Sequence, residues 1–157
     1  MDLEGLDPTS RSFAAEFLRH NPRLARYART EPRPGGGDFL ILTIPADDGG
    51  SPLVVDTGER GRVLVQWGRW SQEFDAPAGA GRSTELGDAL SLVEDLLSGA
   101  ARTYVAWEDD RWRGAGVLYD ELDERRLLER QPRGRRIEIR SFTGESQTIT
   151  VGGVDAG

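Results

Sequence analysis

The feature that most limits the possible folds is one strong amphipathic helix among short strand pairs. Within residues 84–98, apolar residues at Leu86, Leu90, Val93 and Leu97 recur at helical spacing. This spacing predicts a helix with a single apolar stripe. Because a helix of this length has little stability alone, the stripe must cover other apolar residues. We expect Ser83 or Thr84 to cap the start of this helix.

The remainder of the chain has the pattern of strand pairs joined by turns. The expected strands are 39–44, 53–56, 62–67, 70–74, 103–107, 112–119, 136–142 and 147–151, with a short charged helix at 120–131. Clusters of Asp, Gly and Pro separate these segments and favour turns. Hairpins grouped around one helix, without β-α-β alternation, predict an α+β fold. We therefore expect a largely antiparallel sheet of hairpins packed on one main helix, preceded by an N-terminal helical arm.

The N-terminal segment has the pattern of a separate arm. Residues 8–29 have helical spacing, with Asp7 suited to cap the start and Pro22 expected to break or kink the helix. A Pro/Gly stretch at 31–37 follows and is typical of a linker. The chain length of 157 residues fits one main domain. The expected organisation is an arm and linker at 1–37, a domain at 38–151 and a loose tail at 152–157.

Composition excludes several kinds of chemistry. The chain has no cysteine, no lysine and a single histidine, His20, so disulfides, thiolate catalysis, lysine Schiff bases and two-histidine metal sites are excluded. His20 falls at the expected end of a helix, where a cation favours the helix dipole. We expect no cofactor, no metal and no catalytic residue. The absence of a long apolar run, and an acidic N-terminus unlike a secretory signal, predict a cytoplasmic protein that does not span membranes.

Charge is unevenly distributed along the chain. Residues 38–59 contain five acidic residues and no arginine, whereas residues 125–140 contain seven arginines and two glutamates. The net charge of −7 argues against binding to a nucleic-acid backbone. An acidic surface instead favours a basic protein partner.

Four tryptophans complete the set of candidate contact residues. The odd spacing of Trp67 and Trp70 predicts that they point to opposite faces, one in the core and one exposed. Trp107 and Trp112 bracket an acidic turn and are placed to pair across two strands. Exposed tryptophan is typical of interface hot spots. The residues expected to contact a partner are Asp47, Asp48, Trp70, Glu108, Asp109, Asp110 and Trp112.

The stretch from Leu53 to Val151 resembles small bacterial immunity proteins, or antitoxins, of polymorphic toxin systems. The resemblance lies in the order of its parts. They are a strand like Val63-Leu-Val-Gln-Trp67, an acidic helix like Leu90-Ser-Leu-Val-Glu-Asp-Leu-Leu97, a tryptophan hairpin like Val105-Ala-Trp107 with Trp112, and a strand like Ile137-Glu-Ile-Arg-Ser-Phe-Thr-Gly144.

The resemblance implies a non-enzymatic protein that neutralises a toxin domain by occluding its active site. Toxins that attack nucleic acids are commonly basic, and an acidic inhibitor associates with them quickly. Two alternatives remain open. The chain could be a structural or scaffold subunit of a larger bacterial assembly, tethered by residues 1–37, or a small enzyme that works through carboxylates and arginines.

Overall fold

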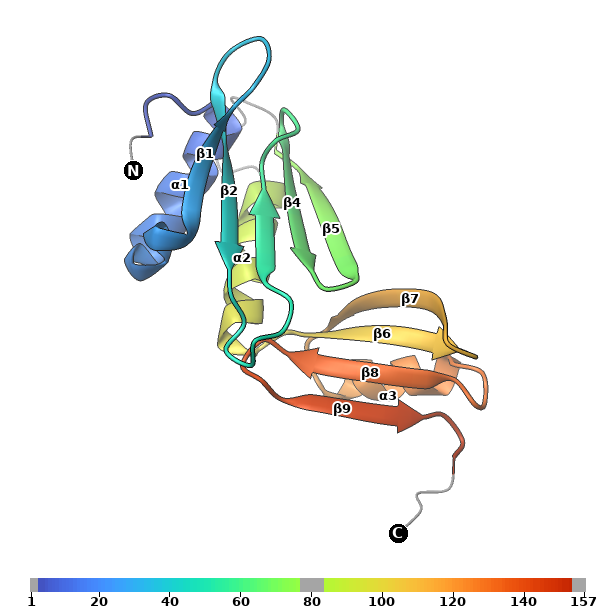
Figure 1. Cartoon of the computed structure of the whole chain (residues 1–157). Coiled ribbons are helices and arrows are strands. Elements are labelled where there is room, and N and C mark those ends of the chain that lie inside the picture. Colours follow the sequence, from blue (N-terminus) through green and yellow to red (C-terminus); the bar gives the residue numbers. More distant parts are fainter. Residues whose placement is uncertain (1–2, 77–83, 154–157) are drawn as a thin grey trace. The chain divides into compact units, whose positions relative to one another are not determined.

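The computed structural model describes residues 3–76 and 84–153 of the chain. In these residues the strands form two antiparallel sheets, and helices accompany both of them (Figure 1). This arrangement confirms the expected α+β class with largely antiparallel pairing. The chain divides into two compact units, Met1–Glu94 and Asp95–Gly157.

The first unit contains the sheet β1-β2-β3-β4-β5, in which each strand pairs with its neighbour in sequence. Its elements are α1 (Pro8–His20), the 3₁₀ helix η1 (Pro22–Tyr27), β1 (Ala28–Pro32), β2 (Asp38–Ile44), β3 (Leu53–Asp56), β4 (Arg62–Trp67) and β5 (Trp70–Asp75). The main helix, α2 (Thr84–Ser98), begins in this unit and ends in the second.

The core of the first unit lies on one face of its sheet. Alternate residues of a strand share a face, and the register places one buried set on the same side. The set consists of Leu40, Leu42, Ile44, Leu53, Val55, Val63, Val65, Trp67, Trp70 and Phe74. Figure 1 shows α1 and α2 on one side of this sheet. The two helices are in contact where His20 Nδ1 lies 3.2 Å from Glu94 Oε1.

Helix α1 begins and ends where a cap and a break were expected. The Asp7 side chain accepts hydrogen bonds from the backbone N–H groups of Thr9 and Ser10, which confirms its capping role. The α-helix ends at His20, which confirms the expected break at Pro22, and the helical segment ends at Tyr27 instead of residue 29. Pro22 has no N–H to donate to the preceding turn, and the chain continues from it as the 3₁₀ helix η1.

The segment expected to be a linker is part of the first sheet. β1 pairs with β2 along its whole length, from Ala28 opposite Leu42 to Pro32 opposite Asp38. The glycines at 35–37 all have φ between +74° and +99°, a conformation that favours glycine in a tight hairpin connection. The chain therefore does not divide at residue 37 as expected. β1 was missed because it is a polar edge strand, in which a proline is tolerated.

Helix α2 buries a face that differs slightly from the expected stripe. Leu86, Ala89, Val93 and Leu96 are buried, whereas Leu90 and Leu97 are half-buried. Leu86 and Val93 of the expected stripe are therefore in the core, with Ala89 and Leu96 beside them as the sequence predicts, whereas Leu90 and Leu97 lie at its edge. The expected cap at Ser83 or Thr84 lies outside the side chains that the structure describes.

The second unit is a four-stranded sheet in the order β7-β6-β8-β9, with one helix packed on it. Its elements are β6 (Arg102–Glu108), β7 (Arg111–Leu118), α3 (Glu121–Arg130), β8 (Arg136–Ser141) and β9 (Ser146–Thr150). Ala106, Leu118, Ile137 and Ile139 form its core, against which Leu127 and Leu128 of α3 pack together with Tyr104, Ile149 and Val151. Residues 154–157 of the expected tail lie outside the described residues. No helix in the described segments is long and apolar enough to cross a bilayer.

Candidate protein-binding surface

The turn between β6 and β7 has a demanding backbone geometry. Glu108 and Arg111 pair across the hairpin, and the two residues between them, Asp109 and Asp110, have φ of 49° and 59°. Two central residues with positive φ define a type I′ turn, which matches the twist of the flanking strands. Asp is among the few residues other than glycine that adopt this conformation. The expected turn is confirmed, and it holds both aspartates in an exposed position.

A row of three large side chains crosses the sheet next to this turn. Trp107 of β6 lies opposite Trp112 of β7 and opposite Arg136 of β8. Because residues directly opposite each other share a face, the three side chains project from the same side of the sheet. The guanidinium carbon of Arg136 lies 5.7 Å from the centre of the Trp107 ring, a distance suited to a cation–π contact. Trp112 is 52% exposed, while Trp107 is half-buried.

Arginines partly neutralise the acidic turn. The carboxylate of Glu108 lies 2.5 Å from Arg113 and 3.2 Å from Arg135. Asp110 lies 3.1 Å from Arg136. The hydrogen bond from Arg135, followed by the positive field of Arg113, lowers the pKa of Glu108 below its ordinary value. Glu108 is therefore a fixed anion that orients its neighbours, and it is poorly suited to act as a general acid.

The other predicted acidic pair belongs to the first unit. Asp47 and Asp48 lie in the exposed turn between β2 and β3. Oδ1 of Asp48 accepts a hydrogen bond from the Gly50 N–H at 2.8 Å, a local contact typical of aspartate in turns. No ion pair to Asp47 or Asp48 occurs within the described segments. The Asp47-Asp48 turn is therefore exposed and acidic, and no arginine of the described residues neutralises its charge.

The expectation that one of Trp67 and Trp70 is exposed is wrong, because both are buried, with 7% and 5% of their surface exposed. The two residues flank a tight turn at Gly68 and lie directly opposite each other in the β4–β5 hairpin. The odd-spacing rule applies along one strand, whereas opposite residues of a hairpin share a face. In the described structure Trp70 is a core residue, so its side chain offers no surface contact.

Sequence reasoning missed the arginines that complete the surface of the second unit. Arg135 and Arg136 appeared only as part of a basic run, and their pairing with Glu108 and Asp110 depends on β8 lying beside β6. The alternating Ile137 and Ile139 were the available signal, since they predict a strand with its odd positions in the core. The pairing of that strand with β6 and β9 cannot be deduced from neighbouring residues in the sequence.

Among the residues that the structure describes, no group of three or more His, Cys, Asp or Glu side chains is placed to hold a metal ion. Comparison with protein-family models, with curated proteins and with solved structures gave no match. Function therefore has to be argued from the surface itself.

Proposed function

We propose that this chain is a non-enzymatic protein-binding protein, and that it acts as an immunity protein that occludes the active site of a toxin domain. The observation that carries the proposal is Trp112, which is 52% exposed beside the rigid Asp109-Asp110 turn. Tryptophan dominates interface hot spots because it buries a large area at a small cost in side-chain entropy. An exposed tryptophan held beside an ordered turn offers a partner a large apolar contact area.

The surroundings of Trp112 favour a protein ligand. Arg136, stacked on Trp107 and paired with Asp110, holds the row of aromatic side chains in place. Such pre-organisation lowers the entropy lost on binding. The antiparallel sheet behind the row provides a rigid support, as an inhibitor that must fit one target requires.

The negative net charge of the chain supports a basic partner, and most of this charge lies in the first unit. Residues 1–94 contain fifteen acidic residues and ten arginines, a balance of −5, out of −7 for the whole chain. The exposed Asp47-Asp48 turn belongs to this unit. An acidic protein attracts a basic one over about 8 Å at physiological salt and speeds their encounter.

The scaffold alternative is less well supported. In that alternative, residues 1–37 form a tether. However, this segment contains α1 and β1, which belong to the first unit. Deletion of residues 1–36 would remove an edge strand and the buried Phe13 and Phe17. The truncation would therefore damage the fold and could not separate the two functions. The nature of the captured partner separates them better.

The first experiment is capture of the partner by the tagged full-length chain in its native host, at low and high salt. The proposal predicts one basic protein, bound in a fixed ratio, which is toxic when produced alone and harmless when produced with this chain. Recovery of several subunits of one assembly would favour the scaffold, and recovery of nothing would contradict the proposal.

Variants then test the surface. Trp112→Ala should raise the Kd for the captured toxin by about thirtyfold or more, the loss expected of a hot spot. Leu122→Ala removes another large apolar side chain, 46% exposed on α3, and should change the Kd less than twofold. Equal effects of the two variants would show that Trp112 is no anchor.

A charge pair of variants tests the steering by Asp109. Asp109→Asn removes a charge at the β6–β7 turn, and Asn tolerates a positive φ as Asp does. Glu145→Gln removes a charge at the exposed β8–β9 turn, at the other end of β8. Asp109→Asn should slow association more than the control, and high salt should reduce the difference.

A further inference from the structure

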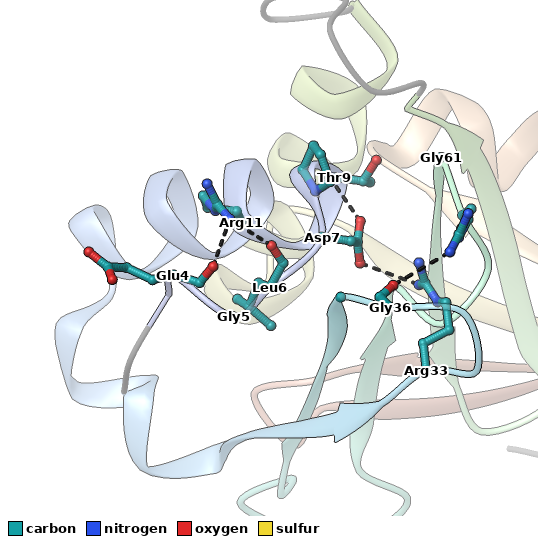
Figure 2. A pocket seen from close by; sticks show the side chains of 12 residues that line it. Glu4, Gly5, Leu6, Asp7, Thr9, Arg11, Arg33, Gly36 and Gly61 are labelled. Atoms are coloured by element: carbon teal, nitrogen blue, oxygen red, sulfur yellow. Dashed lines mark hydrogen bonds and ion pairs between the residues drawn. The ribbon is translucent and has the colours of Figure 1, made fainter.

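A cavity of about 500 Å³ opens in the first unit, beside the start of α1 (Figure 2). Its walls come from three separate segments: residues 4–9 and Arg11, the β1–β2 connection with Arg33 and Gly36, and the β3–β4 connection with Arg60. A volume of this size suits a small molecule. Three arginines line the cavity, against the two carboxylates of Glu4 and Asp7.

Arg33 is the unusual member of this group. Its side chain is 8% exposed, and its Nη2 is shared between Asp7, at 3.3 Å, and the carbonyl oxygen of Thr57, at 2.7 Å. Nε and Nη1 are buried without a hydrogen-bond partner. A guanidinium has five N–H donors, and a buried donor left unpaired is costly. Both nitrogens are also shielded from solvent, so Arg33 adds buried positive charge to the cavity wall and does not offer these donors to a ligand.

Asp7 has little capacity left to satisfy Arg33 further. Its carboxylate caps α1 through the N–H groups of Thr9 and Ser10 and also accepts the Ser10 hydroxyl. The Ser10 hydroxyl lies 2.6 Å from that of Thr57, so a buried polar network converges on this one carboxylate. The helix N-terminus is already occupied by its own cap and adds no free donors to the cavity.

The other two arginines add positive charge from other segments. Within the described residues, Arg11 donates to the backbone carbonyl oxygens of Glu4 and Leu6 at 2.8 and 2.9 Å. Arg60 donates to those of Gly35 and Gly36 at 3.0 and 3.5 Å. Neither pairs with a carboxylate of the described segments, so their charges are not neutralised in a chain of net charge −7. Figure 2 shows Arg11, Asp7 and Arg33 around the same opening.

We propose that this pocket binds the phosphate group of a small molecule, chiefly through Arg11 and Arg60, with Arg33 adding buried positive charge. Guanidinium forks match the oxygens of a phosphate, and each charge-assisted hydrogen bond is about twice as strong as a neutral one. The lining has one arginine more than it has carboxylates, and a phosphate offers more acceptor oxygens to guanidinium donors from different segments than a carboxylate does. The bare glycine backbone at 35–37 leaves room for the rest of the ligand. This site is distinct from the tryptophan surface, and the proposal is independent of the proposed protein partner.

The test is isothermal titration calorimetry of the full-length chain at constant ionic strength. The three titrants are inorganic phosphate, a nucleoside monophosphate and acetate. Phosphate and the nucleotide should bind and acetate should not. A nucleotide that binds tighter than phosphate identifies a larger ligand, whereas equal affinities identify free phosphate as the ligand. Binding of acetate as tight as that of phosphate, or no binding of either phosphate compound at millimolar concentration, would overturn the proposal.

Two matched variants place the binding in this pocket. Arg60→Gln removes an exposed arginine of the cavity wall and should weaken phosphate binding by about tenfold or more. Arg23→Gln removes an exposed arginine of η1 outside the cavity and should leave the affinity unchanged. Neither side chain is buried, so both variants are expected to fold. Equal affinities of the two variants would overturn the assignment.

Discussion

The buried pair formed by Asp7 and Arg33 should be a main determinant of stability in the first unit. The two side chains are 11% and 8% exposed. Removing one partner of a buried ion pair costs about 3–5 kcal/mol, because the other charge stays buried without compensation. Asp7 is also the helix cap, and Asn caps a helix as well as Asp does. Asp7→Asn therefore removes the charge, retains the cap, and should lower the free energy of unfolding by about 3 kcal/mol.

Three further variants separate the contribution of the helix cap from that of the ion pair. Asp7→Ala also loses the cap and should cost about 1 kcal/mol more than Asp7→Asn. Arg33→Met alone leaves Asp7 with its capping bonds from Thr9 and Ser10, so it should cost less than Asp7→Asn. In the double variant Asp7→Asn with Arg33→Met, no buried charge remains, and most of the loss should be recovered.

Urea unfolding, with hydrogen exchange of the amides of β2 to β4, measures these free energies. Tryptophan fluorescence alone is ambiguous, because Trp67 and Trp70 belong to the first unit whereas Trp107 and Trp112 belong to the second. Amides in the first sheet report only the unit that contains the pair. If Asp7→Asn costs less than about 1 kcal/mol, or if the double variant is less stable than Asp7→Asn, the reasoning from an uncompensated buried charge is refuted.

Three other substitutions test separate parts of the second unit. Because the pKa of Glu108 is lowered in the folded state, its stabilising effect is complete above its ordinary pKa of about 4.5 and is lost as the pH falls through the folded-state value. The difference in Tm between the wild type and Glu108→Gln should thus be largest above that pH and shrink in acid, as thermal melts across pH will show. Asp109→Gly should raise stability by about 0.5 kcal/mol, since glycine adopts its φ of 49° without strain, and lower stability in urea unfolding would contradict this. Gly116→Ala should lower stability by about 1–3 kcal/mol, because the new Cβ would lie 2.6 Å from the Tyr104 ring, and an unchanged Tm would show that the ring moves freely.

The turns and hairpins were predictable because their signals are local. The Glu108–Arg111 turn and the start of α1 at Asp7 depend on residues a few positions apart. β1 was not predictable in the same way, because the segment from Ala28 to Pro32 has no apolar alternation. Its strand character comes from pairing with β2. The burial of Trp70 likewise follows from a hairpin register that the spacing of two residues does not reveal.

The candidate site shows a related limit, which concerns charge. In the sequence, Glu108, Asp109 and Asp110 form the most acidic short run among the predicted contacts, and they suggested a surface that attracts a basic partner. In the fold, Arg113 and Arg135 lie on Glu108, and Arg136 lies on Asp110. These arginines are 5 to 27 positions away from the carboxylates they contact, and they arrive there only through the pairing of β6 with β7 and β8.

Long-range pairing therefore gives the two acidic turns different surroundings. At the β6–β7 turn, much of the acidic charge pairs with arginines, so under the proposed function this turn would serve mainly to orient Trp107 and Trp112. At the Asp47-Asp48 turn, the acid lacks arginine partners within the described residues and remains available to attract a basic partner. If the proposed function is correct, reversal of Asp47 and Asp48 should mainly slow association, whereas Trp112→Ala should mainly speed dissociation. Stopped-flow association and dissociation rates of the complex distinguish the two effects, and equal changes in both rates for both variants would contradict this division.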